Sequence, residues 1–262
     1  MATLVCFHAH PDDESIATGG TMAAAAAAGH RVVLVLATKG EHGEVEDGFL
    51  EPGETLAERR VTETHAAAEI LGVAAVEYLG YRDSGMIGTP ENDLAGSFWS
   101  ADVEQAAAQL AEILRRESAD VLTVYDDNGN YGHPDHIQVH RVGVRAAELA
   151  GTPRVYEATV NRDAMIRSFG EFAAEGLLPG DAPDFDEFEL GVSEDQLTTA
   201  VDVTPWLDTK KAAMRAHASQ IAEHSFFLTM PDRAFRVTWG TEWYIRRGVP
   251  TPVEQFETSL FE

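Results

Sequence analysis

Five short apolar runs recur through the first 160 residues, with a helix-like segment between each and the next, and this alternation limits the possible fold more than any other feature. The runs cover residues 3–7, 31–37, 76–79, 120–125 and 154–159. Short, nearly continuous apolar runs are typical of strands buried on both faces of a parallel sheet. Because strands that alternate with helices build the α/β class, the sequence predicts a Rossmann-like, mainly parallel sheet flanked by helices.

The helices expected between these strands have recognisable ends. They cover residues 15–28, 55–71, 103–116 and 134–150. Gly29 and Gly72 follow the first two, and glycine is the usual residue just beyond a helix C-terminus. Pro134 begins the last one, which suits the first turn of a helix. Each predicted strand is thus followed by a helix that can pack against the sheet.

The pattern weakens after residue 160. A helix over 161–174, a helix over 205–224 and β structure over 235–246 are expected there. The stretch 176–195 is acidic and rich in glycine and proline, which is typical of a surface lid or connection. We therefore predict a Rossmann-like catalytic region over 1–160 and a smaller C-terminal α+β portion over 161–262, which carries the lid-like loop.

Charge and cysteine content exclude several classes of protein. A formal net charge of −25 and a pI near 4.6 argue against a nucleic-acid partner, because phosphate contacts need clustered lysine and arginine. No apolar run is long enough for membrane insertion, and no signal peptide precedes the first strand. The single cysteine, Cys6, excludes an intrachain disulfide and fits a reducing compartment. We expect a cytoplasmic protein with a small-molecule partner, and a homo-oligomer stays open.

Two polar clusters follow predicted strands at distant points of the chain. The first is AHPDDE, residues 9–14, and the second is YGHPDH, residues 131–136. Open α/β sheets bind their ligands at the carboxyl ends of the strands, so both clusters stand where a site is expected. Either cluster alone is equally well explained as a capped turn or as charges at a helix N-terminus. Together they indicate one composite site.

The residue types in these clusters suit a catalytic metal. His10 and Asp13 lie three residues apart on a turn, and His136 joins them if the loops after the first and fourth strands converge. Two imidazoles and one carboxylate with an open fourth position form the ligand set of a catalytic zinc or ferrous site. Such a metal lowers the pKa of a bound water from about 16 to about 7, which provides a nucleophile at neutral pH.

The remaining residues of the clusters supply candidates for proton transfer. Asp12 is the candidate general base, since it is adjacent to the ligand Asp13 but projects differently from the turn. His133 could present an imidazolium to the developing oxyanion or protonate the departing amine. Asp135 could hold His133 in the required tautomer, as a carboxylate does for a working histidine.

The paired motifs resemble the PIG-L/LmbE-like zinc N-deacetylase superfamily, and within it the N-acetylglucosaminyl-inositol deacetylases and the mycothiol S-conjugate amidases. The resemblance covers residues 3–150 well and the rest loosely. It implies one divalent metal, zinc or iron, on His10, Asp13 and His136. The catalytic residues that it implies are Asp12 as general base, His133 as the group that stabilises the tetrahedral intermediate, Asp135 as the support of His133, and Tyr131 beside the oxyanion.

The resemblance also implies contacts with the sugar or its inositol partner. The matching positions are Arg60, Asp83 and Met86, with Glu41 as a weaker match. Each has a structural alternative: Arg60 could pair with Glu58 or Glu63 on its own helix, at little gain in stability, and Met86 could fill the core. A buried Arg60 that points at the metal would favour the binding role.

These observations lead to three hypotheses about function. The first is a metal-dependent amidohydrolase that removes an N-acetyl group from an N-acetylglucosamine-type amino-sugar conjugate. The second is cleavage of a bulkier amide, as in a mycothiol S-conjugate, by the same site with a wider pocket. The third, from another class, is a non-catalytic Rossmann-like binding module. It is disfavoured as a nucleotide binder because the first strand is followed by HPDDES rather than by the G-x-G-x-x-G of a dinucleotide site.

Overall fold

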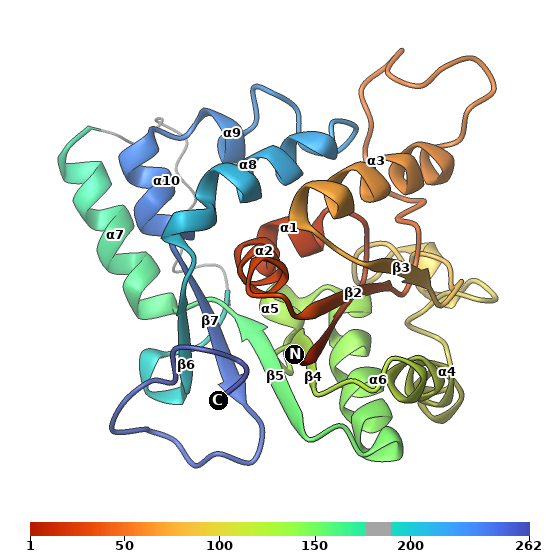
Figure 1. The fold of residues 1–262 in the computed structure, drawn as a ribbon. Coiled ribbons are helices and arrows are strands. Elements are labelled where there is room, and N and C mark those ends of the chain that lie inside the picture. The colour runs from red at the N-terminus through yellow and green to blue at the C-terminus, as the bar shows by residue number, and fades with distance from the viewer. Residues whose placement is uncertain (177–189) are drawn as a thin grey trace.

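The computed structural model describes residues 1–176 and 190–262, and within them the chain forms a single sheet of seven strands in the order β3-β2-β1-β4-β5-β7-β6 (Figure 1). The strands are β1 (Thr3–His8), β2 (Arg31–Leu36), β3 (Ala75–Tyr78), β4 (Val121–Tyr125), β5 (Arg154–Thr159), β6 (Thr199–Asp202) and β7 (Thr241–Arg246). The first five are parallel, whereas β7 is antiparallel to both β5 and β6. The predicted Rossmann-like, mainly parallel sheet is confirmed.

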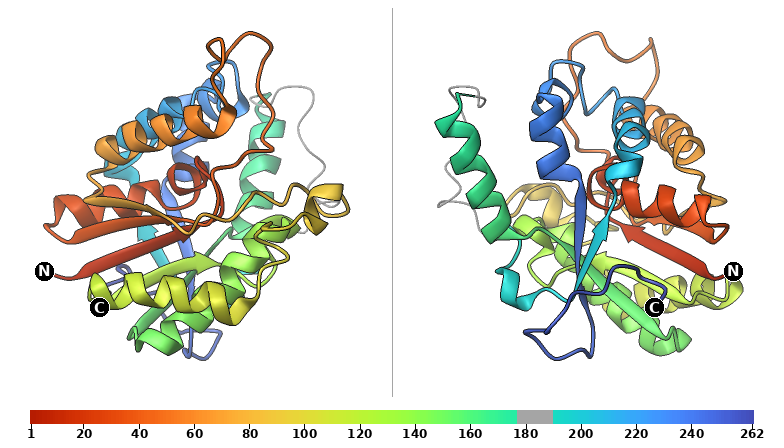
Figure 2. Two further views of the ribbon diagram at one scale, coloured as in Figure 1. Left: turned by 90° about the vertical axis from the view of Figure 1, so that its right-hand side faces the viewer. Right: turned by 60° about the vertical axis from the view of Figure 1, so that its left-hand side comes forward.

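Helices cover both faces of the sheet (Figure 2). The α-helices are α1 (Asp13–Ala17), α2 (Gly19–Ala27), α3 (Leu56–Leu71), α4 (Val103–Arg116), α5 (Gly129–Gly132), α6 (Pro134–Ala150), α7 (Arg162–Ala174), α8 (Leu207–Ala216), α9 (Phe226–Thr229) and α10 (Asp232–Trp239). Short 3-10 turns are η1 (Pro90–Asp93), η2 (Glu194–Gln196) and η3 (Thr204–Trp206). Among the described residues, no helix is long and apolar enough to cross a membrane.

Successive side chains of β1 enter two different cores. Val5 and Phe7 pack into the core that α4 and α6 complete, whereas Leu4 and Cys6 pack into the core on the opposite face, with α2 and α3. All four side chains are fully buried. Each such side chain stabilises the fold by roughly 1.5–3 kcal/mol, which explains why a central strand is apolar on both faces. A third core, which includes Phe172, joins α7 to α8 and α10.

The predicted helix over 15–28 is instead two helices that meet at Thr18. The backbone leaves the helical region there, at φ −132° and ψ 7°. The Glu242 side chain accepts hydrogen bonds of 2.8 Å from the N–H groups of Gly20 and Thr21, so a carboxylate from β7 caps the new helix. Gly20 also lies against Val203, which leaves no room for a side chain. These long-range contacts override the local alanine-rich pattern.

Two further predictions after residue 200 were wrong in part. The stretch 235–246 was predicted as β structure, but its first residues belong to α10, because the helix turns Phe235 into the third core. The helix predicted over 205–224 stops at Ala216, after which the His217 side chain turns inward to Glu14. Both departures depend on packing partners that are far away in the sequence.

The C-terminal portion continues the sheet of the N-terminal one. Residues Tyr156 to Thr159 pair with residues 243–246 of β7, and a buried ion pair between Lys210 and Glu242 connects α8 with β7. The division at residue 160 stays a prediction. Of the acidic segment 176–195, residues 177–189 lie outside the described residues, so its role as a lid also stays a prediction.

Candidate metal centre and active site

The two sequence clusters meet because β1 and β4 are neighbours in the sheet. The chain winds from β1 toward β2 and β3 on one side and from β4 toward β5 on the other, so the loops that leave β1 and β4 bound the crevice where the sheet order reverses. The ring centre of His10 lies 5.4 Å from that of His136 and 4.7 Å from that of His133. The predicted composite site is therefore present as a cluster of side chains.

Two distances between the predicted ligand atoms match those expected around a tetrahedral metal. Asp13 Oδ2 lies 3.4 Å from His10 Nδ1 and 3.4 Å from His136 Nε2. Two ligand atoms that each lie about 2.1 Å from one tetrahedral ion are about 3.4 Å apart. Both ring nitrogens of His136 are buried without a hydrogen-bond partner among the described residues. An imidazole buried with both nitrogens unpaired destabilises the fold unless a partner such as a cation binds one of them. His10, Asp13 and His136 therefore fit a metal.

The second nitrogen of His10 is held by a carboxylate, as is usual for a histidine that binds a metal. His10 Nε2 lies 3.1 Å from Asp135 Oδ2, and Asp135 accepts two further hydrogen bonds from Ser84. Burial alone would lower the pKa of His10, but the carboxylates of Asp13, Asp135 and Asp83 raise it well above its usual value. This arrangement leaves Nδ1 as the nitrogen of His10 that faces the metal position.

The role expected for Asp135 is corrected by these contacts. Its carboxylate contacts His10 and Ser84 rather than His133, and it is the Asp135 backbone N–H that donates to His133 Nδ1, at 3.1 Å. A side chain at the first turn of α6 turns into the core, whereas the backbone N–H points back at the residue that caps the helix. Asp135 thus still fixes the tautomer of His133, but through its main chain.

His133 accepts a hydrogen bond in this cluster, and its surroundings favour the neutral ring. Because Nδ1 accepts from Asp135, the proton of the neutral ring lies on Nε2. Burial, followed by the nearby His10 and His136, lowers the pKa of His133 to about 4. These surroundings favour a neutral ring with its proton on Nε2 over the expected imidazolium.

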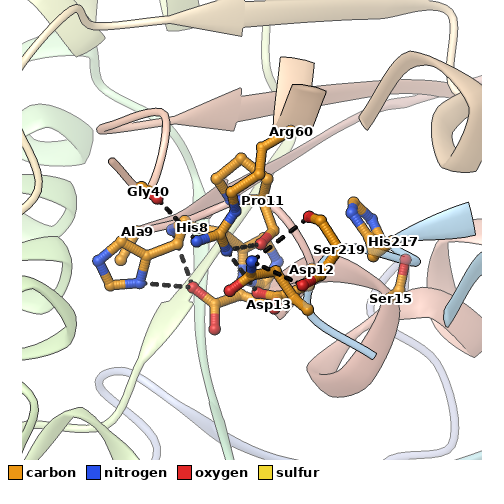
Figure 3. Close-up of polar contacts among 12 residues, drawn as sticks. His8, Ala9, Pro11, Asp12, Asp13, Ser15, Gly40, Arg60, His217 and Ser219 are labelled. Carbon is orange, nitrogen blue, oxygen red and sulfur yellow. Dashed lines mark hydrogen bonds and ion pairs between the residues drawn. The ribbon is translucent and has the colours of Figure 1, made fainter. Parts of the chain in front are cut away.

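Asp12 lies beside the predicted ligands on a backbone that is unusual for aspartate. Its φ is 100° and its side chain is partly buried, 18% exposed. Burial raises the pKa of Asp12 to about 6, against the opposing effect of the Arg60 guanidinium, whose Nη2 lies 3.4 Å from Asp12 Oδ1. Figure 3 shows Arg60 beside Asp12, between Gly40 and Pro11. A carboxylate in this environment can both accept and return a proton near neutral pH.

The four residues predicted to contact substrate have different surroundings. Arg60 is 4% exposed and pairs with neither Glu58 nor Glu63; it donates to the carbonyl oxygens of Gly40, at 2.9 Å, and Pro11. Asp83 lies 3.6 Å from His10 Nε2, and its N–H donates to the Glu41 carboxylate. Met86 is 49% exposed, so it is not core filler. Arg60, Asp83 and Met86 line the pocket described next, whereas Glu41 does not.

A cavity of about 670 Å³ opens in front of the cluster. His10, Asp12 and Asp13 lie on its wall, together with Tyr131, whose ring centre is 4.9 Å from that of His136. On the side formed by α7, α9, α10 and β7 the wall is apolar and aromatic. The side chains that line this aromatic lobe are Met165, Phe169, Phe226, Phe227, Val237, Trp239 and Trp243. The lobe comes from the C-terminal portion, where the sequence showed no site pattern.

Sequence reasoning also missed two buried residues next to the cluster. Glu14 lies on α1 and His217 follows α8, and both side chains are fully buried. His217 Nε2 lies 2.6 Å from Glu14 Oε1. Glu14 is visible in the sequence as a carboxylate within the first motif. No local pattern predicts its partner His217, which lies 203 positions away.

What the fold and the site define together is a metal-dependent hydrolase: two histidines and an aspartate that could hold a cation, with the Asp12 carboxylate beside them and a cavity for the substrate. Residues 5–147 match the family model described as GlcNAc-PI de-N-acetylase (PIG-L). Over 276 aligned residues, which include 100% of this chain and 94% of the relative, the chain is 42% identical to a 1D-myo-inositol 2-acetamido-2-deoxy-alpha-D-glucopyranoside deacetylase of Acidothermus cellulolyticus. The chain belongs to the PIG-L family and is an N-deacetylase, as predicted.

Several solved structures share this fold. The N,N'-diacetylchitobiose deacetylase of Pyrococcus horikoshii aligns with a TM-score of 0.56 at 23% identity, covering 93% of this chain and 83% of that one. The 4-carboxy-2-hydroxymuconate hydratase of Pseudomonas putida aligns with a TM-score of 0.60 at 18% identity, covering 98% of this chain and 100% of that one. Because a deacetylase and a hydratase share the fold, the fold alone does not determine the reaction.

Proposed function

We propose that the chain removes the N-acetyl group from an N-acetylglucosaminyl-inositol, releasing acetate and the free amine. The observation that carries this proposal is the position of Asp13 Oδ2, 3.4 Å from a nitrogen of each of two histidines, with the Asp12 carboxylate next to it at the wall of the cavity. The relative from Acidothermus cellulolyticus, whose name describes this activity, matches the chain over its whole length, which supports the choice of substrate.

A divalent metal, Zn²⁺ or alternatively Fe²⁺, on His10, Asp13 and His136 would polarise the amide carbonyl and make water nucleophilic at neutral pH. Asp12 takes a proton from the water as the water oxygen attacks the amide carbon. The carbon–nitrogen bond then breaks, and Asp12 returns the proton to the departing nitrogen. Asp12 rather than His133 takes the proton from the water, since His133 Nδ1 already accepts a hydrogen bond from the Asp135 N–H.

Two groups stabilise the oxyanion that forms on the amide. His133 donates from Nε2, and the Tyr131 hydroxyl also donates from the cavity wall, where the two ring centres lie 6.1 Å apart. Tyr131 remains a donor through the neutral pH range, because burial raises its pKa above the usual value. Each donor of this kind contributes about 2.7–4 kcal/mol to the transition state in enzymes where one has been removed.

For the substrate we propose contacts from Asp83 and Met86 at the cavity wall. Arg60 and Glu41 act less directly: Arg60 holds the loop carbonyls of Pro11 and Gly40, and Glu41 holds the backbone of Asp83. We further propose that the protein acts on small molecules in the cytoplasm. It binds no nucleic acid, because its net charge of −25 repels phosphate groups.

A second candidate function is favoured by the aromatic lobe. An inositol and a sugar are polar, whereas Phe226, Trp239 and Trp243 would bury an apolar group. Such a group is present in a bulkier amide, for example a mycothiol S-conjugate with an apolar adduct. The same metal and the same Asp12 would cleave that amide, so only the substrate differs.

Parallel assays of the purified, metal-loaded protein test the proposal. We expect acetate release from N-acetylglucosaminyl-inositol, with slower amide cleavage of a mycothiol S-conjugate. Fast cleavage of the conjugate with no turnover of the acetylated sugar would replace the first function by the second. No hydrolysis of either, together with tight metal binding, would favour the non-catalytic binding module.

A further inference from the structure

The backbone of Asp12 holds a conformation that aspartate rarely adopts. Its φ is 100° with ψ at −34°, and residues other than glycine are uncommon at positive φ. Such a conformation persists only where the surroundings fix it, and it is found mostly at functional sites. The question is therefore which groups keep Asp12 in this conformation.

Both polar groups of the peptide unit between Pro11 and Asp12 are bound by buried charged side chains. The Pro11 carbonyl oxygen accepts a hydrogen bond from Arg60 Nη2, and the Asp12 N–H donates to Glu14 Oε2 at 3.0 Å. Because this carbonyl and this N–H belong to one planar unit, any rotation of the plane breaks both hydrogen bonds. Rotation of the plane is also what would change the φ of Asp12.

The two side chains that hold this peptide are themselves fixed. Arg60 donates to the Gly40 carbonyl oxygen at 2.9 Å, and Figure 3 shows its guanidinium between Gly40 and Pro11. Glu14 uses its other oxygen, Oε1, to accept from Ser15 Oγ at 2.7 Å and from His217 Nε2 at 2.6 Å. Neither the Glu14 nor the His217 side chain is exposed to solvent. The contact with His217 comes from the C-terminal portion of the chain.

We propose that Arg60, Glu14 and His217 form a clamp on the Pro11–Asp12 peptide that aims the Asp12 carboxylate at the reacting water. This inference rests on the proposed role of Asp12 as general base. The three residues are positioning residues, since they act through Asp12. His217 is the outermost member: its hydrogen bond orients the Glu14 carboxylate, and Glu14 in turn holds the Asp12 N–H.

Variants of His217 give the first test. In His217→Leu the donor to Glu14 is lost, whereas in His217→Gln a side-chain N–H can still donate to it. The exchange costs nothing at the other ring nitrogen, because His217 Nδ1 has no hydrogen-bond partner in the part of the chain that the structure describes. We expect kcat on the acetylated sugar to fall about 10- to 100-fold in His217→Leu with KM and metal content unchanged, and to recover in His217→Gln.

A neighbouring buried contact provides the matched control. Ser219 lies two positions beyond His217, and its hydroxyl donates to the Glu63 carboxylate at 2.7 Å without touching Glu14. Ser219→Ala removes a buried hydrogen bond at the same place in the fold. We expect kcat within about twofold of the wild-type value. A loss as large as that of His217→Leu would show that any damage to this region lowers activity, which would overturn the proposal.

A double-mutant cycle separates positioning from general destabilisation. If Glu14 acts only through Asp12, Glu14→Ala lowers kcat in the wild-type background and has no further effect in an Asp12→Ala background. Equal fold losses in the two backgrounds would contradict the clamp. Should Glu14→Ala fail to fold, the cycle is run with His217→Leu, for which the same two outcomes decide.

Crystal structures provide a readout that is independent of turnover. We expect the Asp12 φ to leave the positive region in Glu14→Ala or His217→Leu and to stay near 100° in His217→Gln. An unchanged φ in every variant would overturn the clamp even if activity fell. Conversely, if the wild-type protein hydrolysed no amide while φ changed as expected, the clamp would stand as a structural device and the proposed function would fail.

Discussion

Lys210 Nζ and Glu242 Oε1 lie 2.5 Å apart in a place with almost no solvent, where the two side chains are 1% and 3% exposed. The same carboxylate caps the N-terminus of α2, and it accepts from Tyr244 at 3.2 Å. One acidic side chain of β7 thus connects α2, which follows the AHPDDE motif, with α8 from the C-terminal portion. The buried pair couples the two parts of the chain at the wall of the cavity, where neither side chain contacts His10, Asp12 or Asp13 through a hydrogen bond or ion pair described for these residues.

Removal of the lysine charge should destabilise the protein without changing its chemistry. Lys210→Met keeps the apolar stem but leaves the Glu242 carboxylate buried with its helix-capping bonds alone. Breaking a buried pair in this way costs about 3–5 kcal/mol, and the remaining hydrogen bonds place this case near the lower end. Urea unfolding of metal-free protein measures the loss. Arg145→Gln, which breaks exposed ion pairs with Glu104 and Glu148, is the control and should leave the midpoint unchanged.

Asp12 and Asp13 are adjacent, but their removal should have different consequences. Asp13→Ala takes away an oxygen that faces both His10 and His136, so metal content and activity should be lost together. Asp12→Ala should retain the metal while hydrolysis falls about 10²- to 10⁴-fold, the usual contribution of a general base. Elemental analysis of the dialysed variants, beside acetate release, distinguishes these patterns. Full turnover in Asp12→Ala would remove the base assignment.

Much of this site could be predicted because its chemistry is local. His10, Asp12 and Asp13 stand in one motif and His136 in another, and both motifs follow apolar runs that become neighbouring parallel strands. The target of the Asp135 carboxylate was mispredicted, because the side chain's direction depends on how α6 sits against the loop that carries Ser84. The role of Glu14 depends on His217, and no local pattern predicts a contact between residues 203 positions apart.

Two helical glycines should respond to alanine with opposite signs. A Cβ on Gly20 would lie 2.4 Å from the Val203 Cβ, so Gly20→Ala should destabilise the protein by about 1–3 kcal/mol, the usual cost of overpacking. A Cβ on Gly170, within α7, would meet no atom within 4 Å, so Gly170→Ala should stabilise by roughly 0.5–1 kcal/mol through the lower entropy of the unfolded chain. Thermal unfolding of both variants checks the signs. A stabilising Gly20→Ala would contradict the described packing of η3 on α2.

The Glu14–His217 pair should make stability depend on pH in a defined direction. Burial opposes the charge on His217, but the Glu14 carboxylate raises the pKa of His217 above its usual value of 6.5. When the pKa of a group is higher in the folded state than in the unfolded state, its full contribution to folding stability is present at pH values below the unfolded-state pKa. This contribution is lost as pH rises through the folded-state pKa. The wild-type protein should therefore be more stable than His217→Gln, and the difference should be largest near pH 6, just below the unfolded-state pKa of about 6.5. The difference should shrink as pH rises toward 9. Urea midpoints of the two metal-free proteins measure it.

The same linkage predicts a second limit on the acidic side. The His217 ring lowers the pKa of Glu14 below its usual 4.5, although burial alone would raise it. When the pKa of a group is lower in the folded state, its contribution to folding stability is present at pH values above the unfolded-state pKa. This contribution is lost as pH falls through the folded-state pKa. The stability advantage of the wild-type protein over His217→Gln should therefore also decline below about pH 4, where the Glu14 carboxylate becomes protonated. A stability difference that does not vary between pH 4 and pH 9 would contradict an ionised pair.

The aromatic lobe should determine how strongly the enzyme favours substrates with an apolar group. Phe226 lies at the cavity wall, is 38% exposed, and contacts Phe227 with ring centres 6.2 Å apart, so its truncation leaves the metal-binding cluster intact. Phe226→Ala should raise the KM for an amide that carries a bulky apolar adduct by about 10- to 160-fold, which corresponds to the roughly 1.5–3 kcal/mol of burying such a side chain. The KM for the acetylated amino sugar should change little, because that substrate has no apolar group to place there. Ile166→Ala removes an exposed side chain of α7 that is not part of the cavity wall, and it serves as the control. Equal changes in KM for both substrates would mean that Phe226 shapes the cavity as a whole rather than a separate apolar subsite.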